Sequence, residues 1–154
     1  MEKMITRSDE ETKKLAHDFA RLNLVEGSTL TRVIALYGEL GAGKTTFVQG
    51  LAVSLGIKQR IISPTFIIVK LYDLSFARGP LARLTGFYHI DLYRVENEKQ
   101  LEGLGVEEIL EDKNAIVAIE WAEKLGKLLP KRRFDIYFKH ISESQREITI
   151  QELI

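Results

Sequence analysis

A glycine-rich segment at residues 38–45 places the strongest constraint on how this chain folds. It reads Gly-Glu-Leu-Gly-Ala-Gly-Lys-Thr and fits the phosphate-binding pattern G-x-x-x-x-G-K-[ST]. An apolar, branched run precedes it at residues 32–37, and a run with helical apolar spacing follows at residues 46–55, ending before Gly56. The segment is therefore expected to be a loop between a buried strand and a helix whose N-terminus faces bound phosphate.

The residue types of this loop suit a nucleoside triphosphate with Mg²⁺. Glycines allow successive backbone N–H groups to turn inward around phosphate oxygens. Lys44, expected to be an exposed loop lysine, can reach the β- and γ-phosphates, and the Thr45 hydroxyl can ligate Mg²⁺. The predicted nucleotide-binding residues of this segment are Gly38, Glu39, Leu40, Gly41, Ala42, Gly43, Lys44, Thr45 and Thr46.

Composition narrows the class of protein. The 154 residues, 45% apolar and 29% charged, fit a single domain over residues 1–154. Cysteine is absent, which excludes disulfides and thiolate metal sites, and only three histidines are present. The first ten residues lack the apolar core of a signal peptide, and no run reaches membrane-spanning length. A cytoplasmic protein that does not contact membranes is expected.

Charge is balanced overall but segregated along the chain. The formal net charge is zero, which argues against a general nucleic-acid coat protein. Residues 96–112 are strongly acidic, and residues 124–133 carry only basic charges. Each run fits a solvated face. The alternative is a docking surface for a partner protein or RNA.

The remaining pattern predicts alternating helices and strands. Ser8 and Glu11 form a capping-box signature, so a first helix is expected over residues 9–22, as a lid on the sheet edge. Short helices are expected within residues 101–110 and before residue 129. Further strands are expected at residues 66–72, 86–91, 115–119, 134–139 and 146–151. The first two and the last two of these strands are expected to pair as hairpins.

Two carboxylates follow predicted strands and are the candidates for catalysis. Glu120 ends the apolar run at residues 116–119, where phosphate-loop proteins place an acid that holds Mg²⁺. That acid is usually Asp, so the longer Glu120 is either a metal ligand or a base. Asp91 ends the preceding strand and is a candidate for metal or water contacts, or alternatively a turn-forming residue.

The sequence Ser63-Pro64-Thr65 lies between the loop helix and the next strand. Nucleotide switches often carry a threonine there that senses the γ-phosphate and Mg²⁺. An ordinary turn into the strand is the alternative interpretation.

Four blocks together, at residues 38–47, 63–66, 89–94 and 119–121, resemble the TsaE family, the small ATPases of bacterial tRNA threonylcarbamoyladenosine biosynthesis. The resemblance extends over about residues 8–133. It implies ATP and Mg²⁺ as cofactors and two larger partner proteins that transfer threonylcarbamoyl to N6 of adenosine 37 in tRNAs reading ANN codons. Contact with tRNA itself is expected to be indirect or weak.

The resemblance also implies roles for individual residues. It assigns phosphates to residues 41–46 and Mg²⁺ to Thr45 and Glu120. It places four further residues near the nucleotide: Thr65, Asp91, Trp121 and Thr12. Core packing remains the alternative for Trp121.

The expected protein is an ATPase with a three-layer α/β phosphate-loop fold, built on a mainly parallel sheet with an antiparallel hairpin. Water would attack the γ-phosphate, with Lys44 stabilising the transferred charge and Asp91 or Glu120 orienting the water. ATP is favoured over GTP because no [NT]-K-x-D segment occurs. A small-molecule kinase and a non-hydrolysing, ATP-gated binding module are the alternatives. Product analysis separates these three functions: a kinase yields a phosphorylated acceptor, an ATPase yields free phosphate, and a binding module yields neither.

Overall fold

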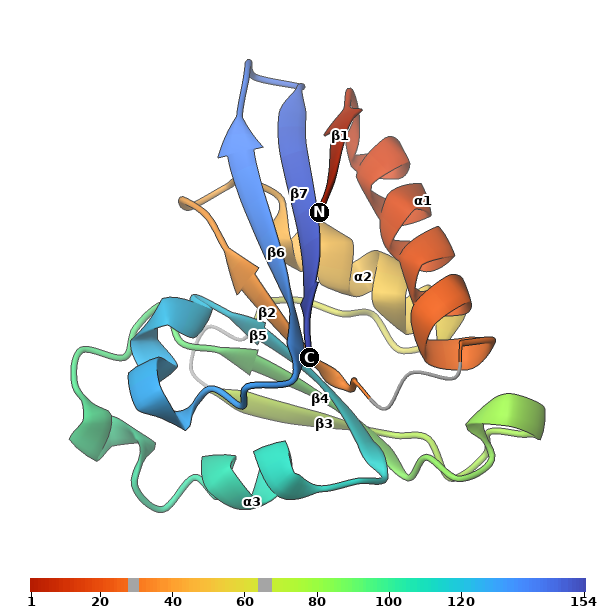
Figure 1. The fold of residues 1–154 in the computed structure, drawn as a ribbon, viewed down its shortest axis with the longest axis vertical. Coiled ribbons are helices and arrows are strands. Elements are labelled where there is room, and N and C mark those ends of the chain that lie inside the picture. Colours follow the sequence, from red (N-terminus) through yellow and green to blue (C-terminus); the bar gives the residue numbers. More distant parts are fainter. Residues whose placement is uncertain (28–30, 64–67) are drawn as a thin grey trace.

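The computed structural model describes residues 1–27, 31–63 and 68–154 and contains one seven-stranded sheet (Figure 1). Its strand order is β1-β7-β6-β2-β5-β4-β3. The strands are β1 (Glu2–Thr6), β2 (Val33–Tyr37), β3 (Val69–Asp73), β4 (Gly86–Asp91), β5 (Ala115–Glu120), β6 (Arg133–His140) and β7 (Arg146–Leu153). The four central strands β6, β2, β5 and β4 are parallel, and antiparallel strands flank them on both sides. This mixed sheet confirms the predicted fold class, including both hairpins.

Helices cover both faces of the sheet, so the fold has three layers (Figure 1). The helices α1 (Asp9–Ala20) and α2 (Lys44–Ser54) pack on one face, while α3 (Val106–Glu111) and the 3₁₀ helices at Glu98–Leu101 and Ala122–Leu128 cover the other. The apolar residues of β2 alternate between the two cores: Ile34 and Leu36 join the first, and Val33 and Ala35 the second. This two-sided burial accounts for the continuous apolar run before the loop. None of the helices in the described ranges has the length and apolar character needed to cross a bilayer.

The first strand and the place of the first helix differ from the sequence-based expectation. β1 was not predicted, because its five residues alternate only weakly and form a strand by pairing with β7, far away in sequence. α1 is not a lid on the sheet edge. It packs along α2, where Phe19 contacts Phe47 and meets Phe134 of β6 edge to face, with ring centroids 4.9 Å apart.

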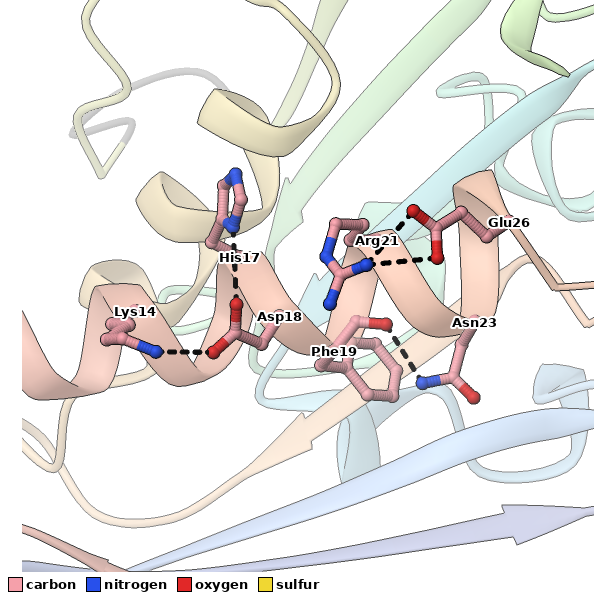
Figure 2. Close-up of polar contacts among 7 residues, drawn as sticks. All are labelled: Lys14, His17, Asp18, Phe19, Arg21, Asn23 and Glu26. Atoms are coloured by element: carbon pink, nitrogen blue, oxygen red, sulfur yellow. Dashed lines mark hydrogen bonds and ion pairs between the residues drawn. The ribbon is translucent and has the colours of Figure 1, made fainter.

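Local hydrogen bonds fix both ends of α1. Ser8 accepts a hydrogen bond from the backbone N–H of Glu11 at 3.1 Å, as the capping signature predicted. Figure 2 shows the other end, where α1 continues into a π-helical turn at Arg21–Val25 and Asn23 donates to the backbone oxygen of Phe19 at 2.9 Å. The ion pairs drawn there lie on the exposed side, so they contribute little, and burial of the opposite side holds α1 in place.

Tyr37 should make the free energy of unfolding fall as the pH becomes alkaline. Its hydroxyl donates to Asp135 at 3.0 Å, and burial together with this carboxylate raises the pKa of Tyr37 from 10.0 to about 12. A pKa that is higher in the folded state contributes stability that is complete below pH of about 10 and lost as pH rises through about 12. We therefore expect the free energy of unfolding, measured by chemical denaturation at about pH 8 and about pH 11, to fall less for Tyr37→Phe than for the parent. Equal losses in the two proteins would contradict this.

Candidate nucleotide-binding site

The glycine-rich loop joins β2 to the N-terminus of α2 and borders a cavity of about 350 Å³. Gly43 caps α2 in a left-handed conformation, with φ of 104°. The backbone conformation requires glycine, and a Cβ at this position would also displace the guanidinium of Arg146. The cavity is lined by Asp9, Leu40, Gly41, Gly43, Lys44, Thr45, Thr46, Ser63, Asp91, Tyr93, Glu120, Trp121 and Arg146. Six of the nine predicted loop residues thus meet the predicted carboxylates at one cavity, whereas Gly38, Glu39 and Ala42 are not among the residues that line it.

Lys44 is buried, contrary to the expectation of an exposed loop lysine. Only 4% of the residue is exposed, and its ammonium group donates to the backbone oxygens of Gly38 at 2.5 Å and Glu39 at 2.9 Å. The same group lies 4.1 Å from the ring centroid of Trp121, a cation–π contact. Burial lowers the pKa of Lys44, while nearby carboxylates, Glu120 first among them, oppose this shift. The lysine is therefore held in place beside the cavity by its own loop.

Thr45 and Glu120, the two predicted Mg²⁺ ligands, are in direct contact. The Thr45 hydroxyl lies 2.8 Å and 3.0 Å from the two carboxylate oxygens of Glu120. Thr45 belongs to the first turn of α2, and Glu120 is the last residue of β5, the strand next to β2. The sheet therefore brings together two oxygen-bearing side chains that are 75 residues apart.

Asp91 lies directly beside Glu120. The two residues are partners in the parallel pairing of β4 with β5, so their side chains leave the sheet on the same face. Asp91 accepts hydrogen bonds from the Ser63 hydroxyl at 2.5 Å and from the backbone N–H of Tyr93 at 3.0 Å. The contact with Ser63 brings the segment before Pro64 to the cavity. Thr65, predicted to sense the γ-phosphate, lies outside the described residues.

Trp121 and Thr12, both expected near the nucleotide, have different surroundings. Trp121 lines the cavity and packs against Tyr93, and it is the single described residue other than glycine with positive φ, at 59°. Thr12 is fully buried and does not line the cavity; its hydroxyl lies 2.8 Å from that of Thr6 and donates to the backbone oxygen of Ser8. These hydrogen bonds connect α1 to the end of β1, and they give the Thr12 side chain a structural role.

Arg146 and Asp9 also line the cavity, and the sequence did not point to either. Arg146 begins β7 and is 7% exposed, with one guanidinium nitrogen paired to Asp9 at 3.0 Å. Its Nε and Nη1 atoms are buried without a hydrogen-bond partner among the described residues. Buried N–H groups of an arginine are costly to leave unpaired. The guanidinium lies against Gly43, and Arg146 is among the residues that line the cavity.

The acidic run lines a groove to which the basic run contributes one charged residue, Lys127. A groove of about 630 Å³ is lined by residues of both runs: Glu98, Leu101, Glu102, Gly103, Gly105, Val106, Glu107, Glu108, Lys127 and Leu128. Arg133, counted in the basic run, pairs with Asp135 at 2.7 Å and is part of the structure of β6. The groove is therefore mainly acidic, with Lys127 as the one basic side chain among the residues that line it.

A buried parallel strand, a glycine-rich loop, a helix that begins at the loop lysine, and carboxylates at neighbouring strand ends together define a phosphate-loop nucleotide-binding fold. Comparison with known proteins agrees and is more specific. The family model described as threonylcarbamoyl adenosine biosynthesis protein TsaE matches residues 6–148. The chain belongs to the TsaE family, which acts in tRNA threonylcarbamoyladenosine biosynthesis.

Individual relatives support this membership. The tRNA threonylcarbamoyladenosine biosynthesis protein TsaE of Bacillus subtilis is 40% identical over 147 residues, covering 94% of this chain and 81% of that protein. The protein of the same description from Treponema pallidum is 36% identical over 146 residues, covering 95% and 97%. The crystal structure of Bacillus subtilis YdiB superposes with a TM-score of 0.74 at 31% identity, covering 99% of this chain and 86% of that one.

Proposed function

We propose that this chain binds ATP with Mg²⁺ in the 350 Å³ cavity and hydrolyses it in support of tRNA threonylcarbamoylation. The observation that carries the proposal is the contact between Thr45, at the start of the loop helix, and Glu120, at the end of the adjacent strand. A hydroxyl and a carboxylate placed together at a helix N-terminus are the pair that holds Mg²⁺ in phosphate-loop proteins.

The side chains at this place fit Mg²⁺. Thr45 and Glu120 offer hard oxygen atoms, which Mg²⁺ prefers. The described residues hold no group of three or more His, Cys, Asp or Glu side chains that would enclose a metal ion. Mg²⁺ bound by one or two protein oxygens completes its shell with phosphate oxygens and water. When bound, the ion would neutralise charge that develops on the phosphates.

The nucleotide phosphates would be held from several sides by this chain. The loop N–H groups and the N-terminus of α2 favour anions, and Lys44 already lies beside the cavity. Arg146 also lines the cavity and would add guanidinium N–H donors from β7. Two strands, β6 and β2, separate β7 from β5, so Arg146 reaches the cavity from the side opposite Glu120. We assign Arg146 to binding the nucleotide, not to stabilising the transferred phosphoryl group.

We assign the orientation of the attacking water to Asp91, because Glu120 contacts Thr45 and is the proposed Mg²⁺ ligand. The oxygens of Glu120 accept from Thr45, the other proposed ligand of the ion, whereas Asp91 accepts from the Ser63 hydroxyl through one oxygen and from the backbone N–H of Tyr93 through the other. The segment that carries Ser63 can thus change how freely the Asp91 side chain moves when nucleotide occupies the cavity. Water attack with Asp91 as the orienting group yields ADP and free phosphate.

A small-molecule kinase has less support from the structure. A kinase needs an acceptor pocket with positioning arginines beside the phosphates. The sequence offers Arg78, Arg83 and Arg94 for this role, and none of the three is among the described residues that line the cavity. Product analysis tests the choice: free phosphate supports an ATPase, whereas a phosphorylated acceptor would support the kinase.

The pathway implies partner proteins, and we propose two, which carry out the transfer to adenosine 37. Without a transition-state arginine beside Glu120 among the residues lining the cavity, the isolated chain should hydrolyse ATP slowly, since such an arginine contributes about 10³-fold or more. The partners would raise that rate. The mainly acidic groove at residues 98–128 is the surface we propose for docking them.

Replacing Arg146 with methionine tests its assignment to the nucleotide. Arg146→Met removes a buried guanidinium whose unpaired N–H groups destabilise the free protein, and the Asp9 carboxylate left behind is exposed. We therefore expect a melting temperature no lower than that of the parent, but ATP-analogue binding about tenfold weaker by calorimetry, or about 1.4 kcal/mol.

Arg133→Met is the matched control, because Arg133 is paired with Asp135 on β6 and does not line the cavity. It should lower the melting temperature and leave analogue binding unchanged. The assignment of Arg146 would be wrong if its own variant behaved like this control.

A further inference from the structure

His89 is a buried polar residue that has no role in the proposed mechanism. It lies in β4, is fully buried, and shares the α2 face of the sheet with Asp91 and Glu120. Its Nε2 atom is 2.8 Å from Oε1 of Glu120. Its Nδ1 atom is buried and has no hydrogen-bond partner within the described ranges.

This environment selects one tautomer of the imidazole ring. An ionised Glu120 carboxylate can only accept, so the hydrogen in the 2.8 Å contact must be on Nε2. A hydrogen on Nδ1 would be a buried donor without an acceptor, which costs more than a bare lone pair. His89 therefore donates to Glu120 through Nε2–H.

Two side chains donate to the Glu120 carboxylate in the described structure, and they approach from different elements. Thr45 comes from α2 and His89 from β4. The Thr45 hydroxyl oxygen is itself a proposed Mg²⁺ ligand. A hydroxyl that ligates the ion through a lone pair can still donate its hydrogen to Glu120, and His89 holds the same carboxylate from a second element.

We infer that His89 is a positioning residue, which orients the Glu120 carboxylate toward a divalent cation at Thr45. The inference rests on the proposed function and extends it to a residue behind the metal ligand. Hydrogen bonds to a ligating carboxylate typically change metal affinity by about 10–100-fold. A buried histidine with a purely structural role would have no such effect.

The tautomer is measurable without any nucleotide. The chain has three histidines, and the other two, His17 and His140, are not buried. Long-range ¹H–¹⁵N correlation spectra should therefore show one imidazole N–H protected from solvent exchange, and it should be Nε2–H. An Nδ1–H tautomer for His89 would overturn the inference, because Nε2 could not then donate to Glu120.

Two substitutions of different reach test the role in metal binding. Glutamine can place its amide N–H₂ near the position of the imidazole Nε2, whereas leucine fills similar space without a donor. With a non-hydrolysable ATP analogue, Mg²⁺ titrations can be followed by the fluorescence of Trp121, the only tryptophan, which lines the cavity. We expect the half-saturating Mg²⁺ concentration to rise at least about tenfold in His89→Leu and to stay within about threefold of the parent in His89→Gln.

His89→Asn covers the case in which the leucine variant does not fold. Its shorter amide reaches only the Nδ1 position, so it should raise the Mg²⁺ requirement as His89→Leu does. Analogue binding without Mg²⁺ should be the same in all folded variants. If the parent responds to Mg²⁺ and the variants without a donor match it, the positioning role of His89 is refuted while the proposed function stands. A parent that shows no Mg²⁺ response would overturn the proposed function and this inference with it.

Discussion

Lys44→Ala is expected to weaken ATP-analogue binding by about a hundredfold or more. The substitution removes the charge that would donate to the β- and γ-phosphates, and charge-assisted hydrogen bonds of this kind contribute about 3 kcal/mol together. Because Lys44 is buried against Trp121 and the oxygens of Gly38 and Glu39, the melting temperature should also fall, but only by a few degrees. Calorimetry and a thermal melt measure the two effects.

Lys124→Ala is the matched control for this loss. The Lys124 ammonium group also lies near the Trp121 ring, at 5.6 Å, and donates to the backbone oxygen of Tyr93, but it belongs to the 3₁₀ helix after β5 and does not line the cavity. Its removal should leave analogue binding within about threefold of the parent. Unchanged binding in a folded Lys44→Ala protein would mean that the loop does not hold phosphate.

Glu120→Gln should separate nucleotide binding from turnover. The amide keeps the size of the side chain but loses the negative charge that Mg²⁺ needs, so we expect ATP hydrolysis to fall at least about tenfold, or about 1.4 kcal/mol of transition-state stabilisation. Nucleotide should still bind through the loop and Lys44. Phosphate release under saturating Mg²⁺ is the measurement.

Asp91→Asn is the companion variant, because Asp91 is paired with Glu120 across β4 and β5 and is the proposed water-orienting group. It should lower turnover with little effect on Mg²⁺ binding. Parental rates in both variants would show that the strand-end carboxylates are structural and that the active site is elsewhere.

The parts of this fold that could be predicted from sequence are those determined by local patterns. The loop at residues 38–45, its flanking strand and helix, and both hairpins follow from glycine placement and from apolar runs bounded by turns. Glu120 and Asp91 could be recognised because parallel strands end at the same edge of a sheet, where ligands bind.

What could not be predicted depends on pairing between distant segments. β1 is a strand because β7 offers it an edge about 140 residues later, and Arg146 reaches the cavity only because β7 returns beside the loop. His89 could be read as an ordinary core histidine, since nothing in the sequence shows that its ring faces Glu120. The burial of Lys44 likewise depends on Trp121, which a left-handed backbone turn after β5 places over it.

The central claim is that ATP binding by this chain supports repeated rounds of tRNA modification. The most direct measurement is a reconstituted assay with the two threonylcarbamoyl-transfer partners, tRNA and ATP, followed over many cycles by the yield of modified adenosine 37. We expect the parent to sustain modification, and Lys44→Ala to give the same low yield as a reaction without this chain. Equal yields with the parent, with Lys44→Ala and with no added chain would contradict the account.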